Sequence, residues 1–271
     1  MIKEIDGQVI HFDIRGEGLP IIILHGLYLD SLTMIHALEE SEISFKGFKR
    51  IYIDMPGMGQ SPIHNLENSS DVMLDLIAKL VAELVQERSF IVMGFSYGGY
   101  IARGIAKKFL SQVIGEVLIC PVAVPYFSDR RVEAITHQEV DEEFLKTLPE
   151  YKQRELLESM VIINEETYTR SEADFLRATA LADFGFVQTL FSGKYASDYI
   201  DQDQRFHTHK TLFLLGFQDT SVGYLDILDL LNFYPHANVT LLTDAGHSFF
   251  LEHPEQFEAL LDTWLFSYKK R

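Results

Sequence analysis

The sequence of 271 residues has little cysteine, a deficit of positive charge and no long apolar run. Its single cysteine, Cys120, excludes an internal disulfide and favours a reducing compartment. Because 40 acidic residues outnumber 23 basic ones, the formal net charge is −17, which disfavours nucleic acid as a partner. No stretch of about 18 apolar residues occurs, so no segment is expected to span a membrane. The first residues do not resemble a signal peptide, and we expect a cytoplasmic protein.

The composition, 47% hydrophobic and 23% charged, is sufficient for one sizeable domain core. An N-terminal hairpin is predicted from two alternating runs that flank Asp6-Gly7. Short continuous apolar runs then alternate with helical periodicity, which is typical of a parallel sheet covered on both faces, an α/β architecture. The predicted strands are 2–5, 9–14, 21–24, 50–54, 90–93, 117–120, 212–215 and 239–242. The clearest predicted helices are 72–85, 100–109 and 254–268.

The interval from residue 122 to residue 206 interrupts this alternation. It shows no convincing strand, only charged helical pattern, as over 142–148 and 154–161. With 17 acidic and 9 basic residues it carries −8 of the net charge. Because the interval is too long for a plain crossover, we predict a core domain of residues 1–121 and 207–271. Residues 122–206 are predicted to form an inserted helical cap over the carboxyl edge of the sheet.

Residues 91–99 show the pattern of a strand, then Gly94-x-Ser96-x-Gly98, then a helix. A serine on such a sharp turn adopts a strained backbone, and the two glycines leave the room that the turn requires. The turn lifts the hydroxyl above the sheet, and the following helix directs its positive N-terminal end to the same point. We therefore predict that Ser96 is a nucleophile. The alternative is a glycine-rich turn with an incidental serine.

A serine nucleophile needs a base and an acid at the same edge of the sheet. His247 follows the last predicted strand and precedes the last helix, so it is predicted to be the general base. Asp219 follows the strand before it, which gives the chain order serine, aspartate, histidine. The rival acid, Asp244, lies only three residues before His247, and such closeness in a turn hinders its carboxylate from reaching the imidazole correctly.

An oxyanion formed by attack of Ser96 needs two backbone N–H donors. One is predicted from Leu27, which follows a buried strand that ends in His25-Gly26, and the other from Tyr97, directly after the nucleophile. The imidazole of His25 is expected to be a structural, hydrogen-bonded group at the strand end.

Several other reactive side chains are interpreted as structural. Cys120 lies in an apolar strand and is expected to be a small buried hydrophobe. Asp54 is expected to stabilise the tight loop after its strand, and Ser61 to cap the segment after that loop. His207 and His209 form a His-x-His pair, but the sequence offers no matching carboxylate or third ligand beside them. No metal site is therefore predicted.

Five motifs occur in order along the chain: His25-Gly26, Asp54-x-Pro-Gly-x-Gly-x-Ser61, Gly94-x-Ser96-x-Gly98-Gly99, Asp219 and Gly246-His247. In this combination the chain resembles the α/β-hydrolase superfamily, of the capped, lipase/esterase-like kind. The resemblance implies a mostly parallel central sheet with helices on both faces. It also implies a catalytic triad of Ser96, Asp219 and His247 that acts through an acyl-enzyme and needs neither a metal nor an organic cofactor.

Departures from related families narrow the chemistry. Epoxide hydrolases and haloalkane dehalogenases use aspartate where this chain has Ser96. Proline iminopeptidases typically have His-Gly-Gly-Pro-Gly and a tryptophan after the nucleophile, whereas this chain has Leu27 and Tyr97 there. Carbon–carbon bond hydrolases usually have a Gly-Pro-Gly stretch that is absent here. Hydrolysis of a small, largely apolar ester, thioester or lactone is the prediction. The alternatives are an acyltransferase, a peptidase, or a non-catalytic ligand-binding protein of the same fold.

Aromatic side chains are frequent in the predicted cap. Most are expected to pin the cap to the core domain, and the others to line an apolar pocket. Together with the negative charge of the cap, this pocket favours small uncharged esters over polyanionic acyl donors such as acyl-coenzyme A. The oligomeric state is left open. The residues are Tyr126, Phe127, Phe144, Tyr151, Tyr168, Phe175, Phe184, Phe186, Phe191, Tyr195, Tyr199 and Phe206.

Overall fold

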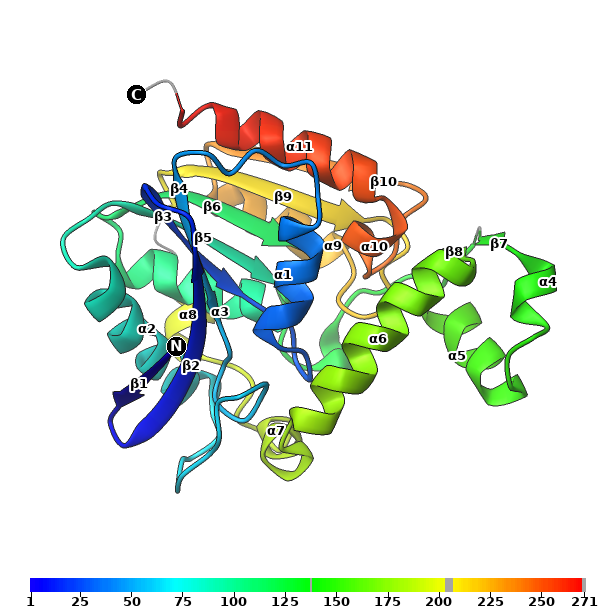
Figure 1. Cartoon of the computed structure of the whole chain (residues 1–271), viewed down its shortest axis with the longest axis horizontal. Helices are drawn as coiled ribbons and strands as arrows, with labels where there is room; N and C mark the ends of the chain where they lie inside the picture. The colour runs from blue at the N-terminus through cyan, green and yellow to red at the C-terminus, as the bar shows by residue number, and fades with distance from the viewer. Residues whose placement is uncertain (137, 203–206, 270–271) are drawn as a thin grey trace.

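A computed structural model of the chain describes residues 1–136, 138–202 and 207–269. Its centre is an eight-stranded sheet with the order β1-β2-β4-β3-β5-β6-β9-β10 (Figure 1). The first two strands are antiparallel to their neighbours and the others are parallel. The strands are β1 Ile2–Ile5, β2 Gln8–Arg15, β3 Leu19–Leu24, β4 Phe48–Ile53, β5 Phe90–Phe95, β6 Val113–Ile119, β9 Lys210–Gly216 and β10 Ala237–Leu242.

Each predicted strand is present, and the fold class is confirmed. Continuous apolar runs give parallel strands because both faces of the sheet are covered: every residue of β5 is buried, as are the last five of β3. The largest displacement is in β6, which begins at Val113, four residues before the predicted start. Cys120 was assigned to this strand but lies just beyond it, with a positive φ of 39°.

Helices cover both faces of the sheet (Figure 1). On one face, α2 (Ser70–Val85) and α3 (Tyr97–Lys108) pack together. On the other face, α1 (Ser31–Glu39) lies beside α11 (Pro254–Phe266), and two backbone N–H groups after α1 donate to carboxylates of α11. Two shorter helices, α9 (Leu225–Leu230) and α10 (Phe249–Glu252), follow the last parallel strands.

Between β6 and β9 the chain leaves the sheet, in the interval predicted to be a cap. The described elements there are mostly helical: η1 Phe127–Asp129, α4 Glu142–Leu145, α5 Glu150–Ser159, α6 Glu165–Leu181, α7 Phe184–Leu190 and α8 Asp198–Asp201. Two short parallel strands, β7 (Glu139–Val140) and β8 (Ile162–Ile163), are also present, so the expectation of no strand in this interval was wrong. The pair was missed because two residues give no alternating pattern.

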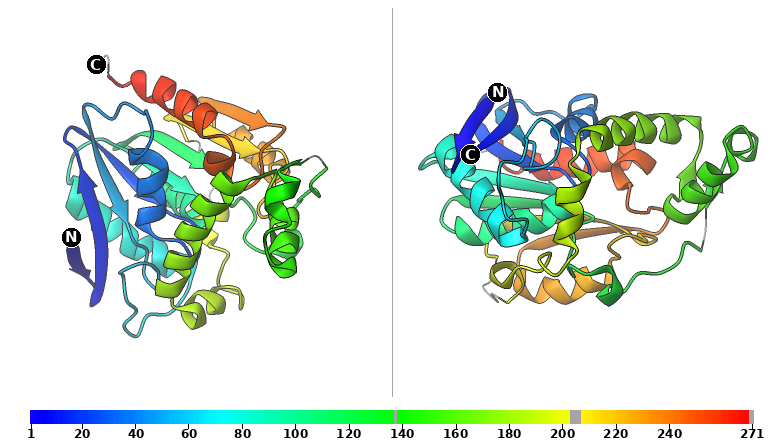
Figure 2. Two further views of the ribbon diagram at one scale, coloured as in Figure 1. Left: turned by 45° about the vertical axis from the view of Figure 1, so that its right-hand side comes forward. Right: turned by 90° about the horizontal axis from the view of Figure 1, so that it is seen from below.

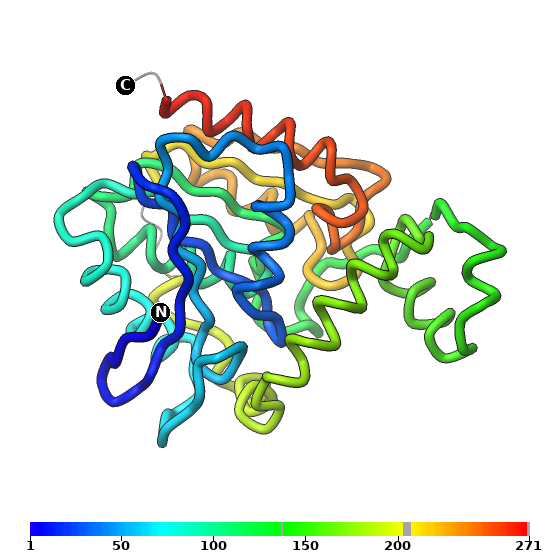
Figure 3. The backbone as a smooth tube through the Cα atoms, viewed as in Figure 1, coloured from blue at the N-terminus to red at the C-terminus, as the bar shows by residue number. Residues whose placement is uncertain are grey.

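This segment has two parts that differ in their contact with the core. Helix α6 crosses in front of the sheet, whereas α4 and α5 project away from it (Figures 2 and 3). The projecting part buries its own small apolar cluster around Leu156 and Met160, separate from the main core. No helix in the described ranges is both long and apolar enough to cross a bilayer.

Candidate active site

Ser96 lies at the sharp turn between β5 and α3. Its φ of 54° and ψ of −118° fall in a region that a non-glycine residue rarely occupies. The turn can close because Gly94 and Gly98 have no Cβ. A Cβ at Gly94 would lie 2.2 Å from the carbonyl oxygen of Gly98, and one at Gly98 would lie 2.4 Å from that of His25. The Ser96 hydroxyl makes no capping hydrogen bond to α3. It is therefore free to face the space above the sheet.

Asp219 and His247 come together from the ends of β9 and β10. The Nδ1 atom of His247 lies 2.8 Å from Oδ2 of Asp219, whose other oxygen accepts hydrogen bonds from the N–H groups of Ser221 and Val222. Burial alone would raise the pKa of Asp219, but the imidazole and these two N–H groups hold the pKa below its ordinary value. The ionised carboxylate fixes Nδ1 as the protonated nitrogen and leaves Nε2 of His247 available as a base.

Asp244, the rival acid, is turned away from His247. Its side chain is 58% exposed, and its carboxylate lies 3.6 Å from Nε2 of His253. The same nitrogen of His253 also lies 2.8 Å from the Asp244 carbonyl oxygen. The structure thus brings Asp219, and not Asp244, to the histidine.

The two predicted oxyanion donors follow different elements. Leu27 follows β3, and Tyr97 is the first residue of α3, where a backbone N–H has no partner within the helix. Among the described residues, neither N–H donates a backbone hydrogen bond. Tyr28, next to Leu27, has a positive φ of 62°, so this loop is held in an uncommon conformation beside the site.

His25 is fully buried and holds the loop in place. Its Nδ1 lies 2.7 Å from the Gly26 carbonyl oxygen, and its Nε2 accepts the N–H of Met55 at 3.0 Å. Burial lowers the pKa of His25, which keeps the imidazole neutral. The structure therefore gives His25 a fixing role between the β3 and β4 loops.

Asp54 and Ser61 close the loop after β4. The Asp54 carboxylate accepts the backbone N–H groups of Ser31 at 2.7 Å and Gln60 at 3.0 Å, and its Oδ2 lies 3.0 Å from Nδ1 of His11. Ser61 was expected to cap the next segment, but no helix begins there. Its hydroxyl donates instead to the Asp54 carbonyl oxygen and accepts the N–H of His11.

Glu252, in α10, is a positioning residue that sequence reasoning missed. Its two carboxylate oxygens accept the backbone N–H groups of Val161 and Gly246, each at 2.6 Å. Because Gly246 immediately precedes His247, this carboxylate fixes the loop that carries the predicted base. Burial raises the pKa of Glu252 although these hydrogen bonds act against the rise. The glutamate lies five residues after the histidine, but no short motif indicated its role.

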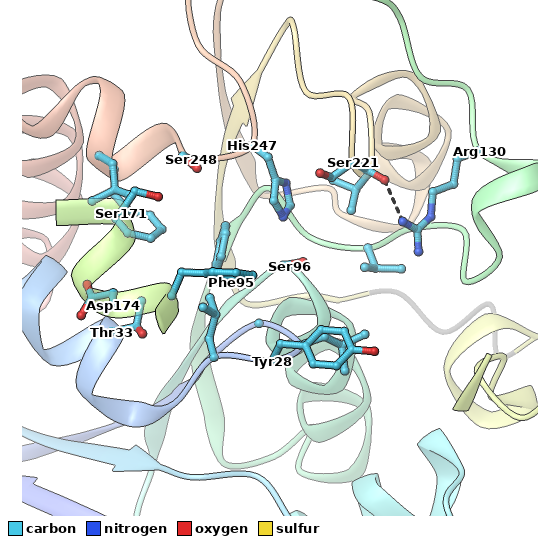
Figure 4. Close-up of a pocket in the computed structure, with 18 of the residues that line it drawn as sticks. Tyr28, Thr33, Phe95, Ser96, Arg130, Ser171, Asp174, Ser221, His247 and Ser248 are labelled. Atoms are coloured by element: carbon cyan, nitrogen blue, oxygen red, sulfur yellow. Dashed lines mark hydrogen bonds between the residues drawn. The ribbon is translucent and has the colours of Figure 1, made fainter. Parts of the chain in front are cut away.

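A cavity of about 350 Å³ lies above the turn that holds Ser96. Figure 4 shows the ring of His247 pointing toward Ser96 and Phe95. No hydrogen bond joins Ser96 to His247 among the described residues, although both line the cavity; such bonds are often long until a substrate binds. Most of the lining is apolar and comes from both the core and the inserted segment: Leu27, Tyr28, Leu29, Phe95, Val122, Phe175, Phe191, Tyr195, Val222, Phe250 and Leu251.

Charged residues lie at opposite sides of this cavity (Figure 4). On one side, Arg130 donates through its three guanidinium nitrogens to the carbonyl oxygens of Val124, Pro125 and Ser221, at 2.6 to 2.8 Å. It thereby joins the start of the inserted segment to the loop that follows Asp219. On the other side lies Asp174 of α6. No short motif marks either residue, because each has a partner far away in the chain: Ser221 for Arg130 and His36 for Asp174.

Asp174 belongs to a latch between α6 and the core, formed with Arg177, Asp30 and His36. Arg177 donates to Asp174 at 2.6 Å and binds Asp30 through two nitrogens, at 2.8 and 3.2 Å. His36 lies 2.7 Å from the same oxygen of Asp174. Burial would raise the pKa of Asp30, but hydrogen bonds from Arg177 and Thr33 hold it below its ordinary value. The latch holds α6 over the cavity.

The aromatic residues of the inserted segment serve both expected purposes. Three of them, Phe175, Phe191 and Tyr195, line the cavity, and Tyr195 also packs on Tyr97. Others pack against the core or within the segment. Phe127 and Tyr151 serve neither purpose, because they are 61% and 68% exposed. Phe206 lies outside the described residues.

Cys120 is buried beside the pair formed by Asp219 and His247, as the sequence led us to expect of a small hydrophobe. Burial raises the pKa of its thiol well above the ordinary value, which disfavours the reactive thiolate at neutral pH. His207 and His209 differ from expectation. The structure supplies the carboxylate that the sequence lacked beside them, because Nε2 of His209 lies 2.9 Å from Oε2 of Glu116 on β6.

Comparison with known proteins agrees with the fold. Residues 21–260 match the model of the Alpha/beta hydrolase family. A monoacylglycerol lipase of Bos taurus is 22% identical, over 93% of this chain and 77% of the lipase. An sn-1-specific diacylglycerol lipase of Danio rerio is 24% identical, over 94% of this chain and 80% of that relative. The crystal structure of an alpha/beta superfamily hydrolase from Oenococcus oeni PSU-1 superposes with a TM-score of 0.84 at 29% identity, over 94% of this chain and 95% of that one. The chain belongs to the alpha/beta hydrolase family.

Proposed function

We propose that this hydrolase is a serine esterase that cleaves a small, largely apolar carboxylic ester, thioester or lactone. Ser96 attacks the carbonyl carbon while Nε2 of His247 takes the hydroxyl proton, and Asp219 stabilises the imidazolium. The N–H groups of Leu27 and Tyr97 stabilise the oxyanion. The imidazolium then protonates the leaving alcohol. In the second half of the reaction, His247 takes a proton from water, water attacks the acyl carbon, and Ser96 regains its proton as the acid leaves.

The observation that carries the proposal is the 2.8 Å contact between His247 and Asp219. His247 lines the same cavity as Ser96. A buried carboxylate on Nδ1 is the arrangement that makes a histidine an effective base for a neighbouring hydroxyl. The lipases among the relatives favour ester hydrolysis.

The cavity supports the substrate class. About 350 Å³ with a mainly apolar lining suits a small acyl or alkyl group, each buried methylene of which is worth about 0.8 kcal/mol. The latch that holds α6 over the site limits the length of chain that fits. Acyl-coenzyme A, a polyanion, would approach a protein of net charge −17 unfavourably.

A substrate panel tests the proposal. We expect kcat/KM for p-nitrophenyl esters to peak at short acyl chains and to fall toward twelve carbons, with acyl-coenzyme A poorer than the best ester. Ser96→Ala should abolish both turnover and labelling by a fluorophosphonate, whereas Ser221→Ala, on another wall of the cavity, should retain both. A rise out to twelve carbons would overturn the substrate class, and labelling of Ser96→Ala would overturn the mechanism.

The main alternative on the same residues is an acyltransferase, in which an alcohol or thiol replaces water in the second step. Product analysis with an added acceptor separates the two: a hydrolase releases mainly the free acid. A non-catalytic binding protein would bind short-chain esters without turnover. A cytoplasmic location and a small-molecule partner remain predictions from the sequence.

A further inference from the structure

The side chains of Glu116, His207 and His209 form a buried cluster that plays no part in the proposed catalysis. These side chains are 0%, 2% and 4% exposed. Oε2 of Glu116 lies 2.9 Å from Nε2 of His209 and 3.4 Å from Nδ1 of His207. We propose that this cluster, which we call the histidine–glutamate site, binds a divalent transition-metal ion, with Zn²⁺ as the best fit.

The local chain directs both histidines to one place. They stand two residues apart in the segment that leads into β9, and both imidazoles approach Oε2 of Glu116. Thr211, two residues further on, pairs in register with Glu116 of β6. The ring of His207 is also stacked on Tyr234, with centroids 4.2 Å apart. Three elements distant in sequence therefore meet at this point.

The ligand atoms match what zinc requires. One nitrogen from each histidine and a Glu116 carboxylate oxygen all lie within 4.8 Å of one another. Bonds of about 2.0 to 2.1 Å in a tetrahedral arrangement place ligand atoms roughly 3.4 Å apart. The contact of His207 already has this length, and that of His209 needs to open by about 0.5 Å. Two imidazoles and a carboxylate are a ligand set that zinc takes up in proteins.

Hydrogen bonding alone leaves the cluster incompletely satisfied. Within the described part of the chain, Oε1 of Glu116 and Nδ1 of His207 have no hydrogen-bond partner although both are buried. Buried polar atoms without partners are rare in native proteins. A metal ion would use the His207 nitrogen directly and displace the proton between His209 and Glu116 to solvent. Water could complete four ligands.

The site is remote from the predicted catalytic centre. Glu116 pairs with Val92, four residues before Ser96 on β5, which places it roughly 13 Å back along the strands. The metal would join β6 to the point where the chain re-enters the core after the inserted segment. Its expected role is therefore structural.

Metal titration of the untagged protein of 271 residues tests the proposal. After chelator treatment, we expect it to bind one equivalent of Zn²⁺ in competition with a chromophoric chelator. Tm should rise by about 5 °C or more when zinc is well above its Kd. Co²⁺ should give the intense visible absorption of a tetrahedral site. Glu116→Gln and His209→Gln should each weaken binding at least about 100-fold, since even outer-shell partners contribute 10- to 100-fold.

His247→Ala is the matched control, because Cys120, Asp219 and His247 are a second group whose atoms lie within metal-binding distance. This variant should keep one equivalent of zinc and the Tm shift. Loss of binding in His247→Ala, with retention in Glu116→Gln, would place the ion at the catalytic residues and overturn the proposal. Failure of the wild type to bind zinc or cobalt, or to change its Tm, would overturn it as well. This outcome needs no variant, so it does not depend on how well the variants fold.

Discussion

Two acid–histidine pairs lie near opposite ends of the parallel strands, and their surroundings give them different uses. At the carboxyl end, His247 has a side chain 19% exposed and lies against Asp219, which is 2% exposed. Toward the amino end, His209 and Glu116 are 4% and 0% exposed. The first pair opens on a cavity that contains Ser96, whereas the second is closed within the core. A similar chemical pair can serve proton transfer only where a reactant can reach it.

The nitrogen used in each pair also differs. His247 contacts its carboxylate through Nδ1, so Nε2 faces the cavity. His209 contacts Glu116 through Nε2, the nitrogen farthest from the backbone. The outer nitrogen of His209 is therefore engaged with Glu116 and is not presented to a substrate. The comparison separates a pair suited to catalysis from one suited to stability.

The largest expected effect comes from the carboxylate of the open pair. Asp219→Asn should lower kcat by about three to four powers of ten, because an amide no longer favours the correct tautomer of His247 or its protonated form. The measurement is steady-state turnover of a short p-nitrophenyl ester. Asp244→Asn is the control and should change kcat little. If the two variants ranked in the opposite order, Asp219 would not be the acid.

The matching change in the closed pair should act on stability. Glu116→Gln keeps the shape but removes the charge that His207 and His209 share, and should lower the free energy of unfolding by about 2 kcal/mol in chelator. Chemical denaturation measures this loss. The kcat of the folded variant should fall far less than in Asp219→Asn. A variant as stable as the wild type would show that the buried contact contributes nothing to the fold.

The latch beside the cavity provides an intermediate test, since it joins α6 to the core next to the open pair. Arg177→Gln breaks the contacts with Asp30 and Asp174 that hold α6 over the site. The loss of about 1.5 kcal/mol should appear as a roughly tenfold rise in KM, with a smaller change in kcat. Arg170→Gln, on the same helix with its Glu166 contact at 3.9 Å, is the control. Equal KM values for the two variants would mean that the latch does not govern binding.

The smallest expected effect is on the acid stability of the same latch. The folded-state pKa of Asp30 lies below its ordinary 3.8, so the unfolded chain binds more protons near and below that pH. The stability that ionised Asp30 contributes is therefore complete above about pH 4 and is lost as the pH falls further. Asp30→Asn should be less stable than the wild type at pH 7, and denaturation series should show this gap narrowing below pH 4. A gap independent of pH would contradict the assignment.

The sheet and the sharp turn at Ser96 were predictable because their signals are local. A continuous apolar run specifies a buried strand wherever it pairs, and Gly94-x-Ser96-x-Gly98 is read from five adjacent residues. The order of Ser96, Asp219 and His247 follows from the succession of parallel strands, whose carboxyl ends share one edge. For the same reason the short helices and strands of the inserted segment were poorly located, since two or four residues carry no periodicity.

Only the tertiary structure decided what lies around the predicted triad. Glu116 stands 93 residues before His209, and Arg177 stands 147 residues after Asp30. No sequence pattern connects such partners, because their approach depends on how strands stack and how the inserted segment folds back. The amino-acid sequence determined the sheet and the residues at its edge. The shape of the cavity, the latch and the histidine–glutamate site depend on the packing of distant segments, where a shift of one residue moves a side chain to the opposite face.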